Sequence, residues 1–151
     1  MKWVTREQVR VDRVSSSWLI LGFIDPEAEI FYVPRDHVMA VAEREDAIPF
    51  DVPDVEMGHH DDKCAFDAIL AKYGSADPGL EGVARIVRGA DTPNKDLTPE
   101  SRGLNSLANG FKLMAQAGNY DDRESIRRQW HMYNALYLVC GGDPAKLPEP
   151  R

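Results

Sequence analysis

The sequence predicts an α+β fold, with a small N-terminal three-stranded sheet packed against a mainly helical C-terminal half. Strand-like segments occur only early in the chain, at 2–6, 29–34 and 48–52. Beyond residue 65, apolar residues recur at the three- and four-residue spacing of amphipathic helices. Because no strand pattern separates these later helices, we prefer this architecture to a doubly wound sheet.

The N-terminal half alternates strands with helices. Residues 2–6 begin it with the alternating pattern of a strand. Three serines at 15–17 offer N-caps for a mainly apolar helix. Asp25-Pro26 ends that helix, because the residue before a proline resists helical geometry. The remaining elements are a strand at 29–34, a helix that opens at Asp36 and a strand at 48–52.

Local signals also divide the C-terminal half into helices. Asp77-Pro78 and Thr98-Pro99 each place proline at the first helical position after a capping residue. Asp121 begins a further helix with Glu124 three residues on, as in a capping box. Gly89 and Pro93 indicate the unwinding or end of the helix that begins at Pro78. The last helix is apolar on nearly all sides, so we expect it to be central and buried.

Composition limits the possible functions. The 151 residues are enough for a single domain, 1–151, with its own core. A formal net charge of −7 argues against nucleic-acid binding by this domain alone, because such binding relies on Lys and Arg. We expect no membrane association, because no apolar segment approaches the ~18 residues of a membrane span. Two cysteines are too few for a disulfide scaffold, so a reducing compartment, the cytoplasm, is expected.

Residues 58–67 (Gly-His-His-Asp-Asp-Lys-Cys-Ala-Phe-Asp) concentrate the side chains that bind transition metals or move protons. Apolar positions from Phe66 to Tyr73 predict a helix directly afterwards. The cluster therefore lies on a strand-to-helix loop and the first helical turn, where N–H groups favour anions. A structural interpretation is equally open, in which Asp61 and Asp62 only cap the helix. No CxxC or HExxH zinc motif is present.

Two further pairs of charged residues are ambiguous. Arg88 and Asp91 lie three positions apart at a predicted helix end, where they would bind an oxyanion or a metal, or form a surface ion pair. Asp12-Arg13 has the same ambiguity at the start of the first helix. From the residues alone we favour the ion-pair interpretation of Arg88 and Asp91.

Several separated motifs occur in a fixed order along the chain. They are 2–6 (Lys-Trp-Val-Thr-Arg), 11–13 followed by 18–20, 23–26, 32–34, 48–51, His59 with 64–67, 86–91, and 133–137. In these motifs the chain resembles the C-terminal domain of ChrB-type chromate resistance proteins over nearly its whole length. The resemblance implies a role in chromate resistance, either as a sensor of chromate or through direct handling of this small oxyanion.

The same resemblance implies a set of site residues but no identified catalytic residue. Those carried over by motif are Arg13 and Arg88 for an oxyanion, His59, Asp62 and Asp91 for a divalent metal (Zn, Fe or Mn), and Cys64 as a possible redox thiol, with Asp12 and Asp122 as secondary candidates. The family often has Cys-Pro where this chain has Ser16-Ser17, which weakens a two-cysteine redox mechanism. The family's Tyr-Asp-Ala-Leu-Tyr also carries Asn134 here, which removes a charge from the last helix.

Three hypotheses follow. The first is a sensor or binding domain in which arginines contact an oxyanion and His59 with an aspartate binds a divalent metal. The second is a metal-dependent enzyme, hydrolytic or redox, that uses His59 and Asp91 with an open coordination position. The third is a structural domain in which these residues form a buried ion-pair network. Clustering favours the first two, and the lack of a complete catalytic motif places binding ahead of catalysis.

Overall fold

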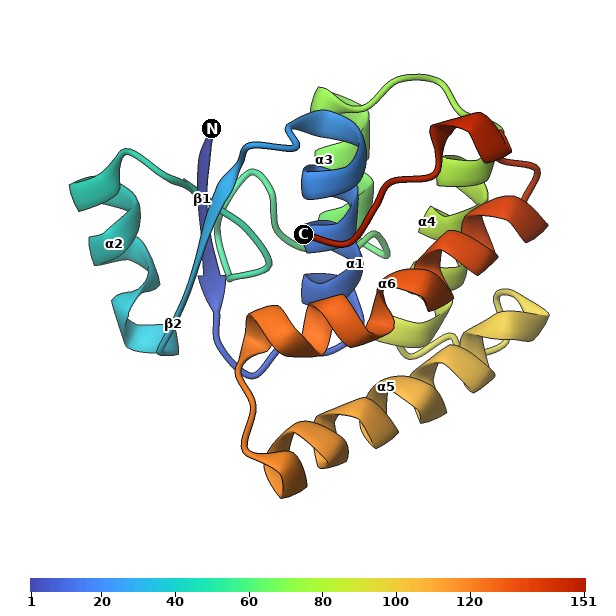
Figure 1. Ribbon diagram of the computed structural model, residues 1–151. Coiled ribbons are helices and arrows are strands. Elements are labelled where there is room, and N and C mark those ends of the chain that lie inside the picture. Colours follow the sequence, from blue (N-terminus) through green and yellow to red (C-terminus); the bar gives the residue numbers. More distant parts are fainter.

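The computed structural model describes residues 1–151 (Figure 1). The strands are β1 (Lys2–Arg6), β2 (Glu29–Val33) and β3 (Ile48–Pro49), and the helices are α1 (Asp12–Leu19), α2 (Val38–Glu45), α3 (Ala65–Tyr73), α4 (Pro78–Asp91), α5 (Pro99–Gly118) and α6 (Asp122–Val139). A π-helical turn, Ile20–Ile24, extends α1, and 3-10 turns occupy Arg35–His37 and Pro144–Lys146. The predicted α+β class is confirmed. None of these helices has the length and apolarity needed to cross a membrane.

The sheet is parallel and has the order β2-β1-β3. In its longer pairing, Lys2 lies opposite Glu29 and Arg6 opposite Val33. Successive side chains of β1 enter different cores: Trp3 packs in the large core with α1, and Val4 packs in a smaller core with α2. Figure 1 shows α1 and α2 on opposite sides of the strands. The N-terminal half is thus a short parallel unit with a helix on each face.

Helix α1 begins at Asp12, so the prediction that serines 15–17 cap it is wrong. All three serines lie inside the helix and are buried. Their hydroxyls donate backwards, Ser15 to the Asp12 carbonyl (3.1 Å), Ser16 to the Asp12 carboxylate (3.2 Å) and Ser17 to the Arg13 carbonyl (2.7 Å). Because each hydroxyl is satisfied locally, a polar segment can occupy the centre of the fold.

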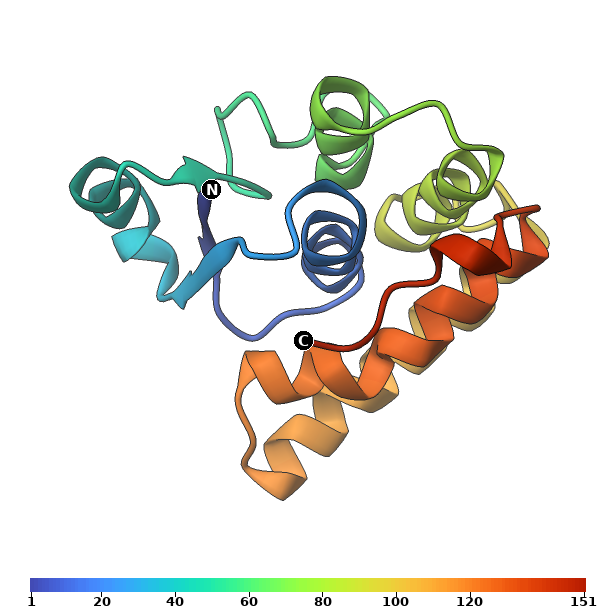
Figure 2. The same cartoon turned by 45° about the horizontal axis from the view of Figure 1, so that its top comes forward.

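The central helix is α1 and not the last helix, contrary to the prediction. Figure 2 shows α1 (blue) between the sheet and helices α3, α4 and α6. Helix α6 buries one face, with Trp130, Tyr133 and Tyr137 in the core, whereas Val139 on another face is 74% exposed. The sheet is too short to enclose α1, so aromatic side chains of α6 cover it instead; the rings of Trp18 and Tyr133 lie 5.9 Å apart.

Helix α4 continues through Gly89 and ends at Asp91, two residues before Pro93, so the predicted end near Pro93 is confirmed but Gly89 does not end the helix. The glycine instead permits close packing with α5, because a Cβ atom there would collide with the side chain of Ser101. The Ser101 hydroxyl donates to the Ile86 carbonyl across this contact (3.0 Å). The predicted caps at Asp77 and Asp121 are confirmed, each accepting a backbone N–H of its helix.

Candidate functional site

Three separate parts of the chain bring acidic residues around a histidine from a fourth part. Asp12 opens α1 after β1, and Asp51 lies two residues after the end of β3. His59 lies in the loop before α3, and Asp91 is the last residue of α4. Asp12 and Asp51 therefore follow the carboxyl ends of parallel strands, the edge of an open α/β sheet where ligands are usually bound.

The imidazole of His59 faces three carboxylates through a single atom. Its Nε2 lies 3.1 Å from Asp51 Oδ1, 3.1 Å from Asp91 Oδ2 and 3.4 Å from Asp12 Oδ2. The single Nε2–H can form a well-aligned hydrogen bond to only one of these oxygens, so the other two lack a full hydrogen-bond donor. Among protein groups, the Asp91 carboxylate contacts only His59. More negative charge converges here than one imidazole neutralises.

Asp12 is the most deeply buried member of this group. Its side chain is 1% exposed, and its two oxygens accept the N–H groups of Ala65 (2.8 Å) and Phe66 (2.9 Å) at the start of α3. These are orphan donors of a helix N-terminus, where the helix dipole favours a negative charge. The carboxylate of α1 thereby joins the two helices and presents Oδ2 to His59.

The electrostatic state of the group follows from these contacts. Hydrogen bonds to Asp12, Asp51 and Asp91 raise the pKa of His59 to about 12, so the imidazole is protonated at neutral pH. Burial, opposed by the hydrogen bond from His59, raises the pKa of Asp12 to about 6. An imidazolium thus stands among the carboxylates, in the place where a cation is electrostatically favoured.

The donor set fits a divalent transition-metal ion. Asp12, His59 and Asp91 each offer one ligand atom, and these three atoms lie within 4.8 Å of one another. Such ions bind nitrogen and oxygen at about 2.0–2.2 Å, which separates adjacent ligands by about 3.0–3.5 Å. The distances from His59 Nε2 to the carboxylates fall in this interval. Imidazole with carboxylates suits Zn, Fe or Mn better than Ca, which prefers oxygen alone.

Both arginines predicted to bind an oxyanion are engaged by carboxylates. Arg13 donates to Asp51 Oδ2 (3.1 Å) and to the Gln8 carbonyl (3.1 Å). Arg88 makes a two-pronged pair with Asp67, at 3.1 Å from Nε and 2.7 Å from Nη2. The guanidinium of Arg13 therefore borders the acidic group through Asp51, while that of Arg88 fixes the first turn of α3.

Two other predicted site residues lie outside the group. Asp62 is exposed in a turn closed by mutual backbone hydrogen bonds between His60 and Lys63, so Asp61 and Asp62 do not cap α3. Cys64 is buried and is itself the N-cap of α3, with Asp67 accepting its backbone N–H (3.0 Å). Burial raises the pKa of the Cys64 thiol. This environment keeps the thiol protonated and favours a structural role.

Sequence reasoning missed Asp51 and ranked Asp12 low. A partial local signal for Asp51 exists, since it lies at the end of a predicted strand; only the structure shows that this strand is parallel to β1. Asp122, the other secondary candidate, accepts the N–H groups of Gln8 (3.0 Å) and Val9 (2.8 Å) and so holds the loop before α1. That loop ends at Val11, whose φ of 35° is rare for a β-branched residue. A strained residue directly before a candidate ligand is common at functional sites.

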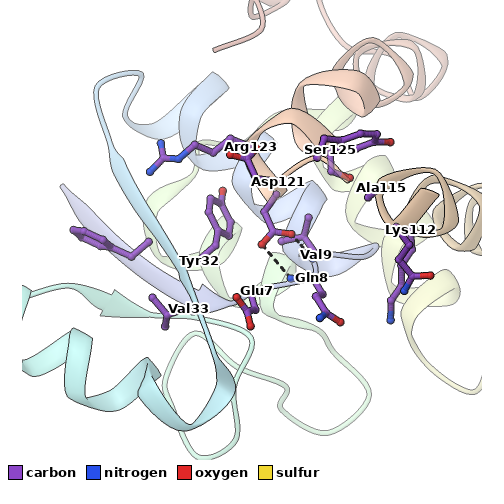
Figure 3. A pocket seen from close by; sticks show the side chains of 14 residues that line it. Glu7, Gln8, Val9, Tyr32, Val33, Lys112, Ala115, Asp121, Arg123 and Ser125 are labelled. Carbon is purple, nitrogen blue, oxygen red and sulfur yellow. Dashed lines mark hydrogen bonds between the residues drawn. The ribbon is translucent and has the colours of Figure 1, made fainter. Parts of the chain in front are cut away.

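One pocket borders the site, and a second cavity lies away from it. A pocket of about 400 Å³ is lined by His59 and Asp51 together with Arg6 and Arg35. A larger cavity of about 510 Å³ lies between the β1–β2 region and helices α5 and α6, as Figure 3 shows, and none of the candidate metal ligands lines it. The candidate metal ligands and the 510 Å³ cavity are thus in different places.

Comparisons with known proteins point to one family. The sequence matches the family model described as "ChrB, C-terminal domain" over residues 3–140. It is also similar to Protein ChrB of Cupriavidus metallidurans, with 30% identity over 112 residues that make up 74% of this chain and 33% of that protein. The chain therefore spans about a third of the length of this relative. No solved structure matches.

Proposed function

Because the chain belongs to the family of ChrB C-terminal domains, we propose that it serves chromate resistance by holding a divalent transition-metal ion between Asp12, His59 and Asp91. The observation that carries this proposal is the convergence of three carboxylates on one imidazole nitrogen. A metal ion would neutralise that charge better than a single proton.

The surroundings of the group support binding of an ion. The Asp12 carboxylate is fixed by two backbone N–H groups, and Asp51 is fixed by Arg13, so these oxygens are oriented before any ion arrives. Asp91, 15% exposed and without another protein partner, is free to turn toward an ion. Deprotonation of His59 would be part of binding, since only neutral imidazole is a ligand.

A metal-dependent enzyme is the alternative, and the exposure of the candidate site supports it as well as it supports a sensor. The side chain of His59 is 44% exposed and borders the 400 Å³ pocket. An ion held there would keep coordination positions open for water or a substrate, as catalytic metals require. A sensor would use the same open positions to bind its ligand. In both cases the small oxyanion, chromate by family resemblance, enters beside the metal.

Elemental analysis of the purified, untagged protein by mass spectrometry tests the proposal. We expect about one transition-metal ion per chain, its loss after treatment with a chelator, and rebinding of Zn²⁺, Mn²⁺ or Fe²⁺. His59→Ala and Asp91→Asn should abolish rebinding while circular dichroism shows an intact fold. His131→Gln, which changes an exposed histidine on α6, is the matched control and should rebind normally. Equal rebinding by all these proteins would refute the site.

A further inference from the structure

A group of positively charged side chains surrounds a second pocket beside the metal group. This pocket, of about 320 Å³, has no apolar residue in its wall. The residues that line it are Arg6, Glu7, Gln8, Arg13, Arg35 and Lys112. Four cations therefore face one carboxylate, in a protein whose net charge is −7. Such a local reversal of charge favours an anionic ligand.

Sheet topology explains why these residues meet. Arg6 is the last residue of β1 and pairs in register with Val33, the last residue of β2. Arg35 follows β2 by two residues, so both arginines lie at the carboxyl edge of the parallel sheet. Lys112 comes from α5, on the far side of the pocket. In the order β2-β1-β3 the chain changes direction between β1 and β3, which is where α/β proteins bind ligands and where the pocket of Asp51 and His59 lies; the cationic pocket adjoins it through Arg6 and Arg35.

Three of the four cations are without a protein partner. The Arg13 side chain donates to Asp51 and to the Gln8 carbonyl. The side chains of Arg6, Arg35 and Lys112 make no hydrogen bond or ion pair with the protein. The Nε atoms of Arg6 and Arg13 are buried and unsatisfied. Burial, and then the proximity of Arg13, lowers the pKa of Arg6. Buried donors without an acceptor are costly, so they indicate a missing ligand.

The acidic groups near these cations do not fill the pocket. Glu7 lines it without any ion pair, and Asp51 is shared between Arg13 and His59. Asp54 and Asp51 face Arg6 and Arg35 only in the adjoining 400 Å³ pocket, which also contains His59. The two pockets share Arg6 and Arg35, so an anion held by these arginines would lie next to the metal group.

We propose that Arg6, Arg35 and Lys112 form the binding site for a tetrahedral oxyanion, adjacent to the metal group at His59. Forked guanidinium donors match the oxygens of such an ion, and the unsatisfied Nε of Arg6 would gain its acceptor. The role of the anion rests on the proposed function, but its binding to these residues does not require the metal. The site differs from the predicted pair, because Arg88 is committed to Asp67.

Two sources offer this chemistry, a free inorganic oxyanion and a phosphomonoester with an organic group. The 510 Å³ cavity shares Glu7, Gln8 and Lys112 with the cationic pocket, and the ring of Tyr32 lines it (Figure 3). The hydroxyl of Tyr120, also in its wall, is buried without a partner. An organic group attached to the anion would therefore have a place to enter.

Isothermal titration calorimetry of chelator-treated protein tests the site, with sulfate, phosphate, chromate and phenyl phosphate as probes. Arg35→Gln and Lys112→Gln each remove a charge without breaking a protein contact, so both variants should fold. Each should weaken binding at least about tenfold. Arg85→Gln, an exposed arginine of α4 outside both pockets, is the matched control and should bind like wild type.

The outcomes separate this site from the metal site. Asp91→Asn should lose metal and retain anion binding, whereas Arg35→Gln should do the reverse. Phenyl phosphate binding more tightly than phosphate would identify an organic phosphate as the ligand class, and equal affinities would identify the free ion. Absence of anion binding by wild type, or undiminished binding by both Arg35→Gln and Lys112→Gln, overturns the proposal even where metal binding is established.

Discussion

The Nε2 atom of His59 lies 3.1 Å from Oδ2 of Asp91, which joins the loop after β3 to the last turn of α4. The same nitrogen also faces Asp12, whose carboxylate is fixed to the start of α3. Neither residue has a local reason to face the other, since each belongs to a different element. The contact therefore depends on the packing of α3 and α4 against α1.

Stability of the metal-free protein should fall as pH rises above about 6.5, relative to the His59→Gln variant. Contacts with Asp12, Asp51 and Asp91 raise the pKa of His59 to about 12, above its ordinary value of about 6.5. The folded state therefore holds a proton that the unfolded state releases, and this stabilisation is complete below about pH 6.5 and lost towards pH 12. Urea unfolding with chelator between pH 6 and 9 measures it; parallel pH profiles would contradict the assignment.

Asp12→Ala should lower the free energy of unfolding by about 2–4 kcal/mol, because it leaves two helix N–H groups and a serine hydroxyl without their acceptor in a buried position. Asp36→Ala, at an exposed position, is the control and should stay within about 0.5 kcal/mol of wild type. Chemical denaturation with chelator present measures both. A loss below about 1 kcal/mol for Asp12→Ala would show that water replaces the carboxylate.

Gly89→Ala should destabilise the protein by about 1–3 kcal/mol, because the added Cβ has to displace the Ser101 side chain between α4 and α5. Gly110→Ala, in the middle of α5 with no heavy atom within 4 Å of its added Cβ, should stabilise by about 0.5–1 kcal/mol through helix propensity. Thermal unfolding of the two variants should thus shift in opposite directions. A gain in stability for both would mean that α4 and α5 separate easily.

Cys64→Ser should retain metal and anion binding, because the thiol is a buried helix cap with a raised pKa. Serine is itself a good N-cap, so the variant should also fold. In the wild-type protein, we expect a thiol reagent to modify Cys140, which is only half-buried, much faster than Cys64. Rapid modification of Cys64 with accompanying loss of metal would restore the redox hypothesis.

The elements that sequence predicts correctly are those with local signals. Strand β1 alternates its faces over five residues, and Asp77 and Asp121 cap their helices through contacts two or three positions away. Gly89 was misinterpreted because its reason is a neighbour on another helix. The predicted capping role of the α1 serines was wrong for a similar reason. Helix centres seldom contain three buried hydroxyls, and only the tertiary packing buries these serines inside the helix.

The candidate site shows the same division. His59 and Asp91 could be predicted from clustering and motif resemblance, and the structure brings them together. Asp12 accepts the first N–H groups of a helix that begins 53 residues later, a relationship that no sequence spacing reveals. The carboxylates that pair with Arg13 and Arg88 could not be predicted either, because tertiary packing decides which carboxylate lies beside an arginine.

All three candidate metal ligands precede residue 92. Helices α5 and α6 supply Lys112 and much of the wall of the 510 Å³ cavity, and Asp122 of α6 holds the loop before α1. In the two proposed sites, the first 91 residues thus supply the metal ligands together with Arg6 and Arg35, and the last two helices add one cation and the wall beside it. If the proposed anion site is correct, we expect substitutions on the inner face of α5 and α6 to change which organic group can accompany the anion, while Asp12, His59 and Asp91 stay unchanged. Such substitutions would have to keep Asp122, because its carboxylate holds the loop that leads into α1 and so positions Asp12.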